Sequence, residues 1–86
     1  MDLYKQMGEE LRALFKDLFH PKQQTEAREK MAQIIDTAKQ IGGSIYEEAK
    51  ELSFDVNHFL KNPTDPKLLA VLKMHASRLE QETREL

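Results

Sequence analysis

The stretch Ala27–Leu60, AREKMAQIIDTAKQIGGSIYEEAKELSFDVNHFL, decides how this chain folds. Its apolar residues recur every three or four positions, which is the period of one face of an α-helix. They are Ala27, Met31, Ile34, Ala38, Ile41, Ile45, Ala49, Leu52, Val56 and Phe59. Gly42 and Gly43 interrupt this face near its midpoint. The architecture depends on whether the chain reverses at these glycines or continues through them as one helix.

Local signals at the glycines predict a reversal. Glycine is favoured just past the C-terminus of a helix. Ser44 and Glu47 have the spacing of a capping box, in which each side chain satisfies a free backbone amide of a new helix. Two glycines inside one helix would also cost about 2 kcal/mol relative to alanines. These signals predict one helix over 25–41 and another over 44–61.

The phase of the apolar face supports an alternative. The inward positions before and after the glycines lie on one continuous stripe at 3.6 residues per turn. The steps Ile41, Ile45 and Ala49 resemble a stutter within a continuous coiled coil. The alternative fold therefore has three helices, of which the central one is long, and its core is completed by dimerisation.

Two further helices flank this stretch. The first is expected over 2–19, where Asp2 can cap the first turn and His20-Pro21 ends the helix. Thr25 is the candidate cap for the helix that follows. The stretch 62–66, NPTDP, is a loop in which Asp65 caps a last helix with Pro66 at its first position, over 66–85.

The 86 residues are therefore expected to form a single domain, an all-α antiparallel up-down four-helix bundle. Its core should contain the large apolar residues of the four stripes. These are Leu11, Leu14, Phe15, Leu18, Met31, Ile34, Ile41, Ile45, Leu52, Val56, Phe59, Leu68, Leu72 and Leu79.

The composition limits the classes of function. Hydrophobic residues make up 40% of the chain and charged residues 33%, which is typical of a folded, soluble protein. The net charge of −2 argues against nucleic acid as a partner. The chain contains no cysteine, and no apolar run is long enough to span a bilayer. We expect a cytoplasmic protein without a cofactor, with neither a nucleic-acid nor a membrane partner.

Three apolar residues lie off the main stripes and could form an interface: Phe54, Val71 and Met74. Buried aromatic side chains dominate the energetics of protein interfaces. The leading hypothesis is a small non-enzymatic protein-interaction or regulatory module that binds a protein partner or itself, as a homodimer.

His58-Phe59-Leu60-Lys61-Asn62 suggests a second hypothesis. This segment resembles the His-x-Leu-Lys-Gly signature of histidine phosphotransfer domains. The resemblance implies a four-helix bundle in which His58 accepts a phosphoryl group with help from Lys61. Asn62 departs from the glycine of the signature, and Pro63 ends the helix where the helix of that family continues.

A third hypothesis is a carboxylate/His metal-binding bundle. Asp55 and His58 lie on one helical face, with Glu51 and Glu48 one and two turns earlier. Di-iron bundles use a related Glu-x-x-His motif twice, but here the motif occurs once and begins with Asp. No residue is assigned as a metal ligand on this basis. His75 is expected to be a half-buried packing residue.

Overall fold

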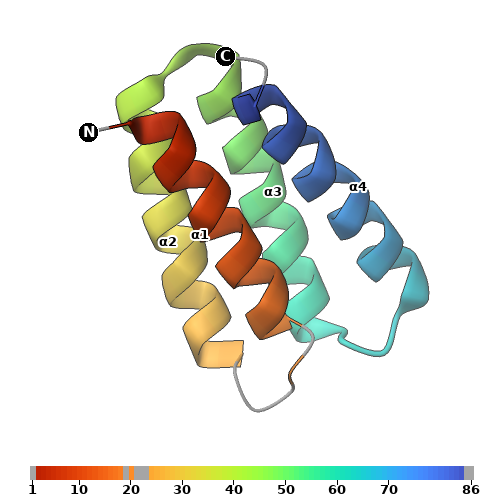
Figure 1. Cartoon of the computed structure of the whole chain (residues 1–86). Helices are drawn as coiled ribbons and strands as arrows, with labels where there is room; N and C mark the ends of the chain where they lie inside the picture. Colours follow the sequence, from red (N-terminus) through yellow and green to blue (C-terminus); the bar gives the residue numbers. More distant parts are fainter. Residues whose placement is uncertain (1, 19, 21–23, 85–86) are drawn as a thin grey trace.

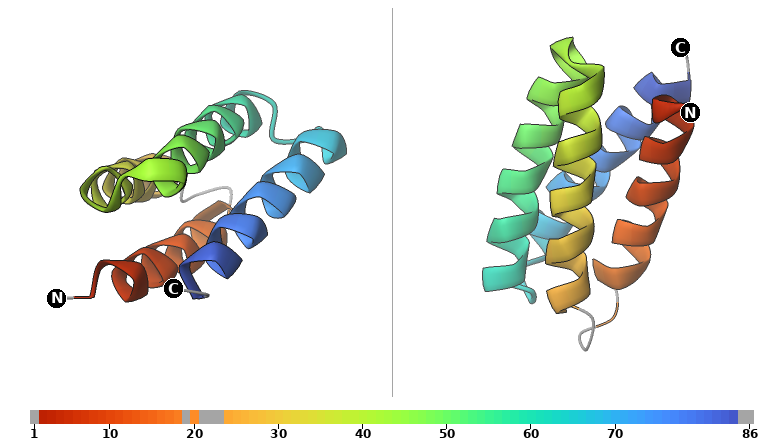
Figure 2. Two further views of the ribbon diagram at one scale, coloured as in Figure 1. Left: turned by 90° about the horizontal axis from the view of Figure 1, so that it is seen from above. Right: turned by 90° about the vertical axis from the view of Figure 1, so that its left-hand side faces the viewer.

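The computed structural model describes residues 2–18, 20 and 24–84. It contains four helices, α1 (Leu3–Leu18), α2 (Gln24–Ile41), α3 (Gly43–Lys61) and α4 (Pro66–Arg84), and the described residues contain no strand. The helices alternate in direction, and each packs against two neighbours in the ring α1–α2–α3–α4 (Figure 1). Viewed from above, α1 and α4 lie on one side of the bundle and α2 and α3 on the other (Figure 2). The predicted four-helix bundle is confirmed.

The chain reverses at the two glycines, so the alternative with one long central helix is wrong. Gly42 adopts φ 81° and ψ −170°, and Gly43 adopts φ 61°. Side chains rarely tolerate positive φ, and the conformation of Gly42 lies in a region that is essentially restricted to glycine. The Gly42 amide donates a 2.7 Å hydrogen bond to the Ala38 carbonyl and thereby closes the last turn of α2.

The predicted capping box at this turn is wrong. The helix α3 begins at Gly43, Gly42 occupies the N-cap position, and no side chain caps the helix. Ser44 therefore lies inside the first turn. Thr25, the other predicted cap, lies inside α2 because that helix already begins at Gln24. Phe19, Pro21 and Glu85, which served as predicted boundaries, lie outside the described residues.

The other two predicted caps are confirmed. Oδ1 of Asp2 accepts hydrogen bonds from the backbone amides of Tyr4 and Lys5, at 3.1 and 3.2 Å. Oδ1 of Asp65 accepts one from the amide of Lys67 at 2.9 Å. Each carboxylate satisfies amides that have no partner within the first helical turn.

The core follows the predicted stripes with three exceptions. Phe15, Ile41 and Leu68 are half-buried and pack around the edge of the core rather than inside it. The remaining predicted core residues are buried. The structure adds Met7 and Leu60 to the core, together with small residues that let neighbouring helices approach closely. These small residues are Ala27, Ala38, Ala49 and Ala76.

Thr37 is a buried polar residue of α2. The helical period places it among the polar residues outside the apolar stripe, which predicts a solvated side chain. It is instead 2% exposed. Its hydroxyl donates a 2.6 Å hydrogen bond to Oε1 of Glu10 and accepts one of 3.3 Å from Nε2 of Gln6. Both partners belong to α1, so this polar bridge lies where α1 covers α2.

Candidate functional site

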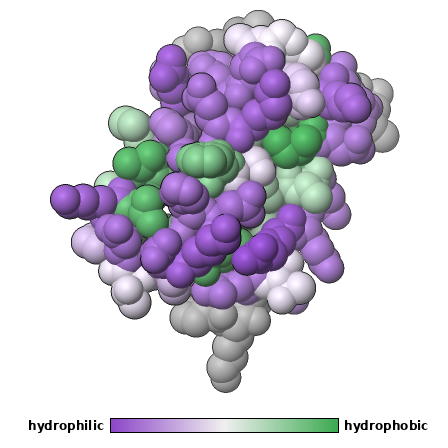
Figure 3. All heavy atoms as spheres, turned by 180° about the vertical axis from the view of Figure 1, so that it is seen from behind, coloured by the Kyte–Doolittle hydropathy of each residue, from purple (hydrophilic) through white to green (hydrophobic). Residues whose placement is uncertain are grey.

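Three large hydrophobic side chains are exposed in the part of the chain that the structure describes. Phe54 on α3 is 63% exposed, and Val71 and Met74 on α4 are 38% and 60% exposed. These are the three residues proposed from the sequence as interface residues. Figure 3 shows the rear of the molecule, where hydrophobic atoms form separate islands in a largely hydrophilic surface. The role of the three residues in an interface stays a prediction.

A hydrogen bond joins α3 to α4 beside these residues. Nδ1 of His75 contacts Oδ2 of Asp55, and both side chains are largely buried. Phe54 and Met74 each directly precede one member of this pair, so each lies about 100° farther around its helix, toward solvent. Val71 lies one turn before His75. We call Phe54, His58, Val71 and Met74 the α3–α4 surface.

His58 is exposed on the last turn of α3. Its ring packs against Phe54, with centroids 4.5 Å apart and planes inclined by 39°. Lys61 is also exposed and is the last residue of α3. The amide of Asn62 still donates to the carbonyls of His58 and Phe59, but Pro63, which follows, has no amide hydrogen with which to continue the helix. The imidazole is accessible to a phosphodonor, but phosphotransfer through His58 and Lys61 stays a prediction.

The side chain of Asp55 pairs with His75 and not with His58, which corrects the grouping on which the metal hypothesis depended. Antiparallel packing of α3 against α4 brings His75 to the carboxylate, a contact that periodicity along one helix does not reveal. Across residues 2–18, 20 and 24–84, no group of three or more acidic or histidine side chains is placed to hold a metal ion.

Two turns before Asp55, a second polar group lies between the same helices. Nε of Arg78 lies 3.7 Å from Oε1 of Glu48 and 3.7 Å from Oε1 of Glu82. One oxygen of Glu48, Oε2, is buried and accepts no hydrogen bond. Two ionised carboxylates can only repel one another, whereas a single proton lets one donate a hydrogen bond to the other.

The pKa of Glu48 is accordingly raised from 4.5 to about 7. The largest cause is a side-chain hydrogen bond with Glu82, followed by burial and by the negative charge of Glu82. Arg78 opposes the shift, because a nearby cation stabilises the ionised carboxylate. Glu48 therefore changes its charge near neutral pH.

Sequence reasoning did not find either polar group, although the helix register contains a signal for both. Asp55 and His75 lie ten residues on either side of Asp65, and Glu48 and Glu82 lie seventeen residues on either side. Residues equidistant from the turn of a helical hairpin come to the same level when the helices pack antiparallel. The sequence contains this symmetry, but the pairs Asp55–His75 and Glu48–Glu82 can be recognised only once Asp65 is known to be the midpoint of the turn.

The hollow between α3 and α4 is too small for an organic ligand. It is lined by Glu48, Glu51, His75 and Arg78 and has a volume of about 10 Å³, roughly the space of one water molecule. None of the described helices combines the length and the apolar character needed to cross a membrane.

The exposed α3–α4 surface thus lies beside polar contacts between the two helices, the Asp55–His75 hydrogen bond and the group formed by Glu48, Arg78 and Glu82. No family model, curated protein or solved structure gives a significant match to this chain.

Proposed function

We propose that this chain is a non-enzymatic interaction module that self-associates through the outward face of α3, with Phe54 at the center of the interface. The observation that carries the proposal is the 63% exposure of Phe54, a large aromatic side chain in the middle of a helix. Burying such a side chain contributes about 1.5–3 kcal/mol. In a two-fold dimer both copies of the residue are buried.

The charges along α3 suit a second copy of the same helix. Glu47 lies seven residues before Phe54, and Lys61 lies seven residues after it. If two α3 helices pack antiparallel about a two-fold axis at Phe54, Glu47 of each copy comes to the level of Lys61 of the other. Both side chains are exposed and can reach across such an interface. Opposite charges at matching positions set the register of helix pairs.

The first test compares the wild-type chain with Phe54→Ala by sedimentation equilibrium. We expect the wild type to dimerise at micromolar to high micromolar concentration. Phe54→Ala should weaken the dimer at least about tenfold, which corresponds to a loss of 1.4 kcal/mol. Gln40→Ala, at an exposed position of α2, should leave the dissociation constant unchanged. If the wild type stays monomeric at high micromolar concentration, self-association through Phe54 is wrong.

A charge-reversal test examines the register. Lys61→Glu should weaken the dimer because it places two acidic residues at each matching level. Adding Glu47→Lys to Lys61→Glu should restore dimerisation, because each copy then again presents opposite charges. Glu29→Lys on α2 makes the same change of charge as Glu47→Lys and should not rescue the Lys61→Glu variant. A double variant as weak as Lys61→Glu alone would contradict the proposed packing.

A further inference from the structure

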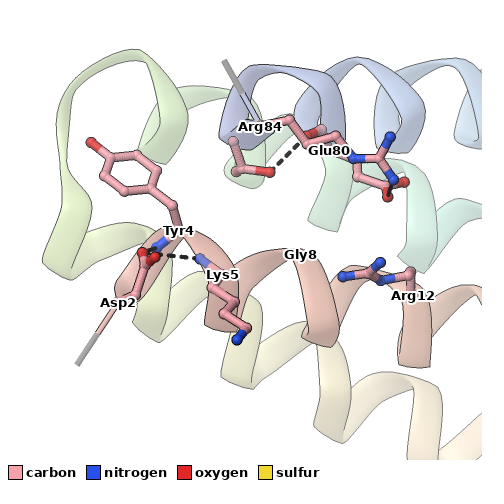
Figure 4. Close-up of a pocket in the computed structure, with 8 residues that line it drawn as sticks. Asp2, Tyr4, Lys5, Gly8, Arg12, Glu80 and Arg84 are labelled. Carbon is pink, nitrogen blue, oxygen red and sulfur yellow. Dashed lines mark hydrogen bonds and ion pairs between the residues drawn. The ribbon is translucent and has the colours of Figure 1, made fainter. Parts of the chain in front are cut away.

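A cleft of about 340 Å³ lies between the first half of α1 and the last turns of α4. Figure 4 shows the side chains around it, which come from both helices. Lys5, Gly8 and Arg12 line it from α1, and Glu80, Thr83 and Arg84 line it from α4. The volume is at the lower end of the range for small-molecule sites, which is about 300–1,000 Å³. This cleft is separate from the outward face of α3.

Gly8 gives the cleft its depth. The residue is buried in the middle of α1, and its φ is not positive, so the backbone does not require glycine. Close packing does not require it either. A Cβ at position 8 would meet only Nη2 of Arg12, at the ordinary contact distance of 3.6 Å. The missing side chain therefore leaves space beside α1 that a larger residue would fill.

The side chains that line the cleft carry a formal charge of +1, from Lys5, Arg12 and Arg84 against Asp2 and Glu80, although the whole chain carries a net charge of −2. The carboxylate of Asp2 accepts hydrogen bonds from two backbone amides, and that of Glu80 binds Arg84 at 2.8 Å. Within the described residues, the side chains of Lys5 and Arg12 have no ion-pair partner. Gly8 lies between them on the same face of α1, and Nη2 of Arg12 lies 3.6 Å from the position of a Cβ at Gly8. The side chain of Lys5 extends away from Arg12 and α4 (Figure 4), and its ammonium group reaches this space by a change of rotamer.

We propose that this cleft binds a small, free, multivalent anion, either a phosphate group or a di- or tricarboxylate, through Lys5 and Arg12. The planar guanidinium of Arg12 suits two-point hydrogen bonding to carboxylate or phosphate oxygens, and Lys5 adds a compact positive charge. The two residues are seven positions apart, which separates their Cα atoms by about 10 Å along the helix. Two cationic side chains that can both reach one space favour a ligand with more than one negative charge.

The test is a titration followed by ¹⁵N–¹H correlation spectra, with inorganic phosphate and citrate as separate probes at constant ionic strength. At least one probe should produce saturable shifts of the amides of Lys5, Gly8 and Arg12. Lys5→Gln and Arg12→Gln should each weaken binding at least about tenfold. Lys39→Gln and Arg28→Gln remove the same charge from exposed positions of α2 and should leave the affinity unchanged. Gly8→Leu should abolish binding by filling the cleft, with folding checked by circular dichroism.

Three outcomes would overturn the proposal. The first is the absence of saturable shifts with either probe in the folded wild type. The second is an equal loss of affinity in Arg28→Gln and Arg12→Gln, which indicates a general charge effect. The third is binding only to vesicles containing phosphatidic acid, which would assign the cations to a lipid headgroup instead of a free anion. Because Lys5 and Arg12 lie outside the proposed dimer interface, failure here leaves self-association unaffected.

Discussion

Asp55 of α3 and His75 of α4 form a hydrogen bond that joins the two helices beside the exposed Phe54 and Met74. Both side chains are largely shielded from solvent. Loss of one partner therefore leaves the other without its hydrogen bond and with little water to replace it. We expect a double-mutant cycle of Asp55→Ala and His75→Ala to show a coupling energy of about 1 kcal/mol. Urea denaturation measures it.

The pair Glu47 and Lys50 provides the control for this cycle, with all variants measured at a protein concentration below that at which the proposed dimer forms, because Glu47 belongs to its interface. Its ion pair measures 3.1 Å, but the two side chains are 68% and 47% exposed and lie within one turn of α3. Exposed pairs of this kind contribute about 0–0.5 kcal/mol. A coupling energy for Asp55 and His75 no larger than that of the control would show that their hydrogen bond adds nothing to the packing of α3 against α4.

The three glycines should respond differently to alanine. Gly42→Ala should destabilise the fold by about 1–3 kcal/mol, because its φ and ψ lie in a region reserved for glycine. Gly43→Ala should cost about 1–2 kcal/mol, since its φ is also positive. A Cβ at either site would meet no atom within 4 Å, so the cost comes from the backbone.

Gly8→Ala is the matched control, because Gly8 is helical and alanine fits there in ordinary contact. It should stabilise the fold by about 0.5–1 kcal/mol. Thermal and urea unfolding of the three variants measure the series. Stabilisation by Gly42→Ala would contradict the assignment of this residue to the turn between α2 and α3.

The fold could be predicted from the sequence because helical periodicity and two caps act locally. The reversal at Gly42 was predicted, but the capping box was not formed, since the glycines supply the turn without a side chain. The prediction that Thr37 is solvated is wrong, because the hydrogen bonds that bury it depend on how α1 covers α2. Polar contacts between helices depend on rotation and register, which the apolar stripes fix only to within the width of a stripe.

The candidate site was predicted less completely than the fold. The exposure of Phe54 and Met74 could be predicted from the sequence, because both residues lie off the apolar stripes of their helices. The pairing of Asp55 with His75 requires the antiparallel register of α3 and α4. The cleft beside Gly8 requires the distance between α1 and α4, and no local pattern encodes that distance.

The hydroxyl of Thr37 should contribute measurably to the free energy of unfolding. Thr37→Val keeps the shape of the side chain but removes the hydrogen bonds to Glu10 and Gln6. We expect a loss of about 1–3 kcal/mol, because Thr37 is 2% exposed and removal of its hydroxyl leaves two partly buried partners unsatisfied. Thr37→Ser keeps the hydroxyl and should retain more stability. Equal stability of the valine variant and the wild type in urea unfolding would remove any stabilising role for this bridge.

Glu48 should make the stability of the bundle depend on pH. Its pKa is about 7 in the folded chain, against 4.5 for an unperturbed glutamate side chain. Between these two values the folded chain binds more protons than the unfolded chain, so stability falls as pH rises. Below about pH 4.5 both states are protonated at this residue, and above about pH 7 both are ionised. The fall is therefore confined to the interval between them.

The variant Glu48→Gln isolates this contribution. Its amide can donate a hydrogen bond to Glu82 at every pH, as the protonated carboxyl does, and it never carries the repelling charge. We expect Glu48→Gln to exceed the wild type by on the order of 1–2 kcal/mol at pH 8, after allowance for solvent screening, and to match it near pH 5. Urea denaturation at a series of pH values measures the difference. Glu29→Gln, at an exposed position of α2, is the control for the removal of one carboxylate. A difference between Glu48→Gln and the wild type that does not change with pH would contradict the raised pKa of Glu48.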